Sequence, residues 1–363
     1  MTVIFNFIFK LVVFIMALLY LLFPVYLKIL GLFKRKTRST AGEIPSASLM
    51  ILYGQNLKQL KSKIENCLSL EPTGASLELV VAVNERDSSV ESLVSGYFKK
   101  GVKLFYPAEK KTPAETMVLC VTECNGEAVI VTDTASKLDP YAAKNILRKF
   151  ADAKTGAVSG KAIYTGGHDN YRGGLNVIEA YSEYVTRLLD AAGLVVSANA
   201  LLYAFRKSAV DGIPAGSAGS SAVPLRSLFN GYASRFEPLA VAELELHGKA
   251  GVLAEEEARE LALALGSGSS MKELFRKKKF NSWLCALFDN ILLPSSGIAI
   301  FLLFVLNLLL ITTDLFFIFI FAAQVVFYAA ALTGISKTAY YVSLHSYASI
   351  KAVYTVCSGK DAK

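Results

Sequence analysis

Three long apolar runs constrain the fold of this 363-residue chain more than any other feature. The first extends from Phe7 to Phe33 and is interrupted by only two lysines and one proline. The other two, Gly297–Thr313 and Leu315–Thr333, are separated by Asp314. Because about 20 apolar residues cross a bilayer, these runs predict an N-terminal transmembrane helix and a C-terminal transmembrane hairpin. A cleaved signal peptide is disfavoured because no small-residue cleavage site follows the first run.

Basic residues flank the apolar runs and predict their orientation. Four follow the first run directly, and four more precede the hairpin, which is followed by another lysine; these are Lys34, Arg35, Lys36, Arg38, Arg276, Lys277, Lys278, Lys279 and Lys337. Lysine and arginine are enriched in cytoplasmic loops. We therefore expect an integral protein of the plasma or inner membrane whose central part lies in the cytoplasm.

Two further apolar segments lie near the hairpin. Phe280–Leu293 is short and amphipathic and contains the only tryptophan, which is typical of a helix lying in the membrane interface. Ala339–Cys357 is apolar but contains four tyrosines. The sequence leaves open whether this second segment is a third span or another interfacial helix.

The charge distribution supports a division into membrane flanks and a globular middle. Residues 39–275 contain 24 basic and 27 acidic residues, a net charge of −3, whereas the flanks together carry +11. A basic nucleic-acid-binding domain is therefore excluded. We expect three parts: an N-terminal helix with its basic stop over 1–38, a cytoplasmic domain over 39–275, and a membrane-associated part over 276–363.

Strands and helices alternate through the middle part. The patterns predict strands and helices in the order helix 57–68, strand 77–83, strand 102–106, helix 114–123, strand 128–132, helix 141–150, strand 157–164, helix 175–189 and strand 201–205. Such alternation favours an α/β domain with a mostly parallel sheet covered by helices. Ligands bind beyond the carboxyl ends of such strands, which directs attention to Asn84 and Asp133.

Asp133 is the sharpest single candidate because it ends a buried strand. An acid there can hold a divalent cation against a diphosphate, since hard cations prefer oxygen ligands. The alternative is that Asp133 caps the following helix or turn. The five cysteines and three histidines show no metal-ligand spacing, and Cys120 and Cys124 are expected to pack in the core in reduced form.

The order of several segments resembles the membrane-bound family-2 glycosyltransferases, the processive polysaccharide-synthase type with a GT-A nucleotide-sugar fold. The similar segments run over about residues 46–250 and are SLMIL, KIENCLSL, LELVVAV, NGEAVIVTDTASKLDPYA, GAVSGK, ALLYAFRK, VPLRSLFNGY and FEPLAVAE. The resemblance implies a nucleotide-sugar pocket whose residues would include Asn84, Asp87, Lys111 and Asp133, with Asp133 as the metal ligand.

The motifs that carry the family's chemistry are degenerate here. Its Asp-Gly-Ser reads Asn84-Glu85-Arg86, with Asp87 as a plausible second acid, and the acid expected two residues after Asp133 is Ala135. The acidic pair that supplies the general base before Val-x-Pro-Leu-Arg is replaced by Ser220 and Ser221, which are not bases near neutral pH. The Gln-x-x-Arg-Trp signature is also missing, with at most Arg259 retained.

These losses favour an inactive homologue that acts as a membrane partner subunit in exopolysaccharide or envelope glycan synthesis. Its partners would be the bilayer and an active synthase subunit or a second copy, with no nucleic acid and no cofactor. The alternative is an active inverting transferase that uses a nucleotide sugar with Mg²⁺ or Mn²⁺ and takes its base from Asp211, Glu237 or Glu243.

Overall fold

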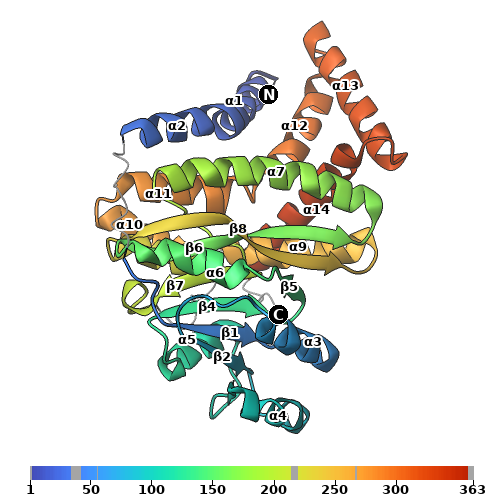
Figure 1. Cartoon of the computed structure of the whole chain (residues 1–363). Helices are drawn as coiled ribbons and strands as arrows, with labels where there is room; N and C mark the ends of the chain where they lie inside the picture. The colour runs from blue at the N-terminus through green and yellow to red at the C-terminus, as the bar shows by residue number, and fades with distance from the viewer. Residues whose placement is uncertain (1, 34–41, 55, 214–219, 266–267, 359–363) are drawn as a thin grey trace.

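The computed structural model of the chain describes residues 2–33, 42–54, 56–213, 220–265 and 268–358. Within this part an eight-stranded sheet forms the centre, in the order β3-β2-β1-β4-β7-β6-β8-β5 (Figure 1). The strands are β1 (Ala47–Leu52), β2 (Leu77–Ala82), β3 (Val102–Phe105), β4 (Ala128–Asp133), β5 (Ser136–Leu138), β6 (Thr155–Gly166), β7 (Leu202–Arg206) and β8 (Ala233–Leu246).

The sheet is mixed, so the prediction of a mostly parallel sheet is wrong. Strands β3, β2, β1 and β4 are parallel to one another, but β7 is antiparallel to both β4 and β6, and β5 is antiparallel to β8. Strand β8 is again parallel to β6. After the helix between β6 and β7, Leu194 bridges Ser234 of β8 beside the beginning of β6, and the chain then runs forward along the sheet to Leu201 before β7 turns back antiparallel to β6. The alternation of strands and helices along the sequence does not reveal whether the next strand turns back antiparallel or is reached by a crossover and runs parallel.

Helices cover both faces of the sheet. They are α3 (Leu57–Leu68), α4 (Ser88–Ser95), α5 (Pro113–Glu123), α6 (Ala142–Arg148), α7 (Asp169–Ala191), α8 (Ala222–Phe229) and α9 (Ala250–Leu265). Local caps explain several starts: Asn56 accepts from two backbone N–H groups of α3, and Thr112 with Glu115 forms a capping box on α5. The parallel strands bury apolar side chains on both faces, and Cys120 and Cys124 belong to one of these cores as free thiols.

The predicted apolar runs form helices at one end of the molecule (Figure 1). The N-terminal run is α1 (Thr2–Ala17), a π-helical turn and α2 (Phe23–Phe33), and the hairpin is α12 (Ser296–Leu310) with α13 (Leu315–Leu332). Thr2–Phe33 and Leu315–Leu332 are each long and apolar enough to cross a membrane. α11 (Phe280–Leu287), with its π-helical extension to Leu292, is followed by α12 at an angle of 59°. Taken together, this bent pair is also long and apolar enough to cross a membrane.

The last described helix, α14 (Lys337–Cys357), lies against α7 and α9 of the globular part as well as against α12 and α13. For Ala339–Cys357 the sequence left open a third span or an interfacial helix; within the described residues this helix is not among those long and apolar enough to cross a membrane, and it packs against the globular part. The contact with α7 is close: a Cβ added at Gly174 would come within 2.3 Å of the carbonyl oxygen of Lys337. The division of the chain at 38 and 275 stays a prediction, and residues 34–41 lie outside the described ranges.

Candidate functional site

The Asp133 carboxylate closes the turn that follows β4. Its Oδ2 atom accepts from the backbone N–H of Ala135 at 3.3 Å, and Oδ1 accepts from the backbone N–H of Ser136 at 3.2 Å and from the Ser136 hydroxyl. Both carboxylate oxygens therefore serve the turn between β4 and β5. Of the two roles that the sequence offered for Asp133, the structure displays the capping role.

A buried ammonium group lies behind this turn. Lys63 of α3 is only 2% exposed, and its Nζ atom donates to the carbonyl of Ser136 at 2.8 Å and to the Ser136 hydroxyl at 3.0 Å. Desolvation lowers the pKa of Lys63, and the charge of Asp133 acts in the opposite direction. Ser136 thus connects a cation to an anion through one hydroxyl group.

Asn84, Asp87 and Lys111 lie beyond the ends of β2 and β3. The backbone N–H of Lys111 donates to the carbonyl of Asn84 at 3.0 Å, so the structure brings these two together. Asp87 caps α4 by accepting from the backbone N–H of Ser89 at 2.8 Å. Asp133 also lies at the carboxyl ends of the parallel strands. One strand separates it from this group, because β1 lies between β2 and β4.

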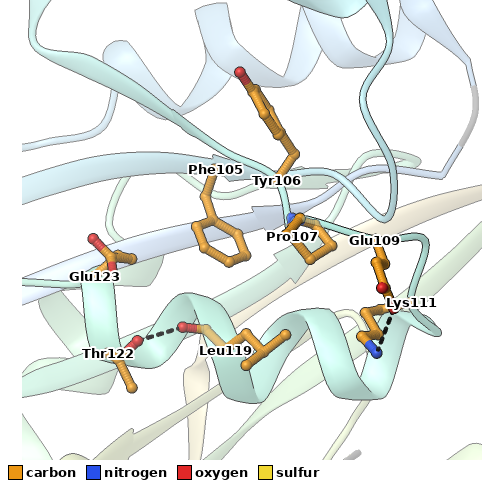
Figure 2. Close-up of a pocket in the computed structure, with 9 residues that line it drawn as sticks. Phe105, Tyr106, Pro107, Glu109, Lys111, Leu119, Thr122 and Glu123 are labelled. Atoms are coloured by element: carbon orange, nitrogen blue, oxygen red, sulfur yellow. Dashed lines mark hydrogen bonds and ion pairs between the residues drawn. The ribbon is translucent and has the colours of Figure 1, made fainter.

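A depression of about 450 Å³ lies between the end of β3 and α5 (Figure 2). Lys111 contributes to its lining together with Phe105, Tyr106 and Leu119. This depression is at the sheet edge formed by β3 and does not include Asp133. It therefore offers an aromatic surface of mixed charge, in which Lys111 lies near Glu109, and it is separate from the Asp133 turn.

Ser220 and Ser221 lie at the start of α8, where the resemblance placed the general base. The carbonyl of Ser220 accepts from the backbone N–H of Ala198 at 2.9 Å. The segment that begins with Ala198 reaches β4, since the Thr132 hydroxyl donates to the carbonyl of Leu201 at 2.8 Å. The start of α8 is thus on the Asp133 side of the sheet, and no acid is present between Ile213 and Phe229.

The three acids proposed as substitute bases lie elsewhere. The carbonyl of Asp211 accepts from Arg226, near the end of β7 that is opposite to Asp133. Glu237 forms an ion pair with Lys149. Glu243 pairs in register with the exposed Lys137 of β5, and its carboxylate accepts from Thr165. Paired residues share a face of the sheet, so Glu243 is on the face opposite to the Ser136 side chain.

Two acids that the sequence did not single out interact with each other, and one of them, Glu260, also interacts with the charge of Asp133. Desolvation by the surrounding protein raises the pKa of Glu260 of α9 to about 7 although solvent reaches it, and the charges of Glu257, Glu256 and Asp133 add to this shift. Desolvation, followed by the charge of Glu260, also raises the pKa of Glu179 of α7 to about 7. Neither carboxylate has a hydrogen-bond or ion-pair partner among the described residues.

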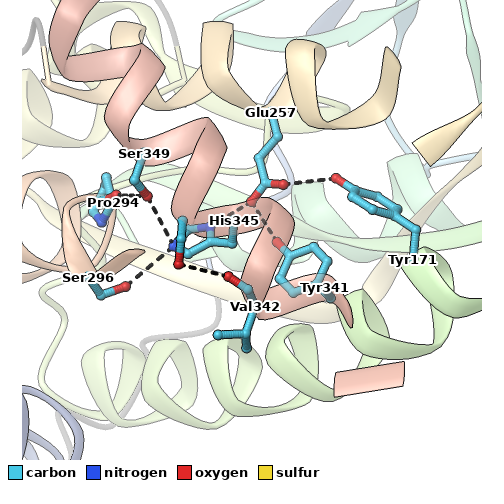
Figure 3. Close-up of polar contacts among 9 residues, drawn as sticks. Tyr171, Glu257, Pro294, Ser296, Tyr341, Val342, His345 and Ser349 are labelled. Atoms are coloured by element: carbon cyan, nitrogen blue, oxygen red, sulfur yellow. Dashed lines mark hydrogen bonds and ion pairs between the residues drawn. The ribbon is translucent and has the colours of Figure 1, made fainter. Parts of the chain in front are cut away.

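Glu257, one turn before Glu260 on α9, by contrast has hydrogen-bond partners at both carboxylate oxygens (Figure 3). It accepts from the hydroxyl of Tyr171 on α7 at 2.9 Å and from that of Tyr341 on α14 at 2.7 Å, and it lies 2.7 Å from His345 Nδ1. His345 Nε2 in turn lies 3.3 Å from the hydroxyl of Ser296, at the start of α12. This network joins α7, α9, α14 and the hairpin of α12 and α13.

The residues present do not form a divalent metal site of the expected kind. Among the described residues no group of three or more His, Cys, Asp or Glu side chains is placed to hold an ion. Asp133 uses both oxygens within its turn, Ala135 offers no ligand, and an ammonium group stands behind the turn. A cation bound by Asp133 would be repelled by Lys63, and the position two residues on, Ala135, offers no second carboxylate.

Comparison with known proteins gives the fold. No family model matches the chain, and no curated protein matches it. Among solved structures it is similar to the mannosyltransferase PcManGT from Pyrobaculum calidifontis in complex with GDP-Man and Mn²⁺, with a TM-score of 0.68 and 14% identity over 97% of this chain and 99% of that chain. A second neighbour is GalNAc-T7 with UDP, GalNAc and Mn²⁺, with a TM-score of 0.44 and 12% identity over 58% of this chain and 46% of that chain.

The chain therefore has a glycosyltransferase fold of the GT-A-like kind. The likeness to the mannosyltransferase extends over nearly the whole of both chains, including the helices long and apolar enough to span a membrane. At 14% identity this likeness establishes the fold and not the reaction.

Proposed function

We propose that this chain is a membrane-bound, family-2-type member of the glycosyltransferase fold that has lost sugar transfer and acts as a partner subunit. Its setting would be the synthesis of an exopolysaccharide or another envelope glycan. The proposal rests on the start of α8, where the resemblance places the family's general base and this chain has Ser220 and Ser221. Loss of a general base costs a typical enzyme roughly 10²–10⁴-fold in rate.

The surrounding geometry supports the same conclusion. Asp133 stabilises a turn, the acid two residues later is Ala135, and none of Asp211, Glu237 and Glu243 faces the Asp133 turn. The fold is nevertheless similar to that of a mannosyltransferase over almost the full length of both chains. A protein that keeps the scaffold but not the reactive groups is suited to binding another component.

Turnover by the purified full chain tests this proposal. We expect nanodisc-embedded protein, offered GDP-mannose, UDP-glucose or UDP-N-acetylglucosamine with Mn²⁺ or Mg²⁺, to release no nucleotide above the level seen with the Asp133→Asn variant. Release that the wild type supports and Asp133→Asn abolishes would contradict the loss of catalysis.

An active inverting transferase is the second candidate, and a specific observation favours it. The pKa values of Glu260 and Glu179 are raised to about 7, which is the range of a general base near neutral pH, and the charge of Asp133 contributes to the shift of Glu260. In this case Glu260→Gln would abolish nucleotide release. The exposed Glu71→Gln would retain it, because Glu71 is not among the charges that shift the pKa of Glu260. Equal turnover of the two variants would exclude Glu260 as the base.

The proposed location is the plasma or inner membrane, with the globular part on the cytoplasmic side. The basic residues that flank the apolar helices support this orientation. The proposed protein partner is an intact synthase of the same fold or a second copy of this chain, with no nucleic acid involved. Light scattering of the detergent-solubilised chain would reveal a second copy as a doubled protein mass.

A further inference from the structure

The Asp133 turn differs from a metal site in the source of its positive charge. In the similar mannosyltransferase complex the nucleotide sugar is accompanied by Mn²⁺. In this chain a cation is already built into the protein, because the Lys63 ammonium group donates to Ser136, and the Ser136 hydroxyl donates to Asp133. We propose that Lys63 takes the place of a divalent cation at this turn, so that Asp133 is a partner of an internal ammonium group and not a metal ligand.

The hydrogen bonds that connect Lys63 through Ser136 to Asp133 all run in one direction from donor to acceptor. Lys63 can only donate, so the Ser136 hydroxyl accepts from Nζ and passes its single proton to Asp133 Oδ1. The carbonyl of Ser136 accepts a second proton of the same ammonium group at 2.8 Å. These hydrogen bonds satisfy the ammonium group of Lys63, a residue that is only 2% exposed. A charged lysine without partners would be strongly unfavourable at such a buried position.

The position of Lys63 is set by its helix. It lies on the buried stripe of α3 with Leu60, Ile64 and Cys67, whereas Lys61 two residues earlier is exposed. Burial of a lysine on an otherwise apolar stripe needs a compensating anion, and Asp133 supplies it through Ser136. The inference concerns binding and stability and holds whether or not the chain transfers a sugar, so it does not rest on the proposed function.

Manganese binding to the full chain in nanodiscs tests this inference directly. Free Mn²⁺ gives a strong electron paramagnetic resonance signal that weakens on binding. We expect wild type and Asp133→Asn to leave the same fraction of Mn²⁺ free at submillimolar concentration. Micromolar Mn²⁺ binding by the wild type that Asp133→Asn abolishes would overturn the inference. This measurement needs only the wild type and a near-isosteric variant.

A double-mutant cycle supplies the second measurement. Lys63→Met and Asp133→Asn each leave one charge uncompensated. The sum of the two single-variant decreases in thermal midpoint should therefore exceed the decrease in the double variant. Lys61→Met, on the same helix but exposed, is the matched control and should leave the midpoint unchanged. Additive losses in the cycle would show that Lys63 and Asp133 are not coupled. If Lys63→Met does not fold, the manganese measurement still decides.

Discussion

His345 Nδ1 of α14 lies 2.7 Å from the Glu257 carboxylate of α9, and its other ring nitrogen faces Ser296 at the start of α12. A single side chain therefore links the helix that carries Glu260 to the helices proposed to cross the membrane. Because Tyr171 and Tyr341 donate to the same carboxylate, Glu257 is the centre of this contact.

Replacing Glu257 should loosen this junction. We expect Glu257→Leu to lower the free energy of unfolding by about 2–4 kcal/mol, because three hydrogen-bonding groups with little exposure lose a charged acceptor. Urea unfolding in detergent, followed by tryptophan fluorescence, measures the change. Glu256→Gln on the exposed side of α9 is the control and should stay close to wild type. An equal effect of both variants would refute the central role of Glu257.

The raised pKa values of Glu179 and Glu260 predict a pH dependence of stability. Between about pH 4.5 and 7 the folded protein keeps protons that the unfolded chain has released, so the free energy of unfolding falls as pH rises through this window. We expect Glu179→Gln and Glu260→Gln to flatten this slope in thermal melts. The exposed Glu71→Gln should keep the wild-type slope. Unchanged slopes in both site variants would contradict the prediction.

The close contact between α7 and α14 predicts strong intolerance of a side chain at Gly174. A Cβ there would meet the carbonyl oxygen of Lys337 and the Cβ of Tyr341, each at 2.3 Å. We expect Gly174→Val to cost about 1–3 kcal/mol of stability, the usual range for overpacking. Gly251→Ala on α9 meets nothing within 4 Å and serves as the control. A thermal midpoint for Gly174→Val equal to that of the control would show that α14 does not pack as described.

Cys357 provides a test of orientation. All five cysteines lie in the described part of the chain, and of these Cys357 is exposed whereas the other four are buried. If the globular part is cytoplasmic, a membrane-impermeant maleimide should modify the protein in inverted vesicles but not in intact spheroplasts. Cys357→Ser should remove the labelling. Modification in intact spheroplasts would reverse the proposed topology.

Local patterns predicted most of the separate elements. The buried runs at β2 and β4 and the apolar stripe of α3 are visible in the sequence because each depends on neighbours within a few residues. Strand direction was not predictable in this way, since β7 pairs with β4 and β6 from distant positions. The position of Asp133 at a strand end was predicted correctly, but its partners in the turn emerged only in three dimensions.

Glu179 and Glu260 likewise show that contacts between distant positions are not visible in local sequence patterns. Glu179 and Glu260 are 81 positions apart, and their proximity results from the packing of α7 and α9 around α14. One local signal was available: Glu257 and Glu260 are three residues apart in a helical run and so share a face. Lys63 offered a comparable signal, a lysine on the apolar stripe of an amphipathic helix.

The position of α14 also implies an order of events during biogenesis. This helix follows the hairpin in the sequence but packs against α7 and α9, which precede it. The globular part therefore cannot complete its packing until α14 has followed α12 and α13 out of the ribosome. If α12 and α13 cross the membrane as proposed, their insertion comes before this last step, and a chain whose hairpin failed to insert would expose the uncovered faces of α7 and α9 to quality-control proteases.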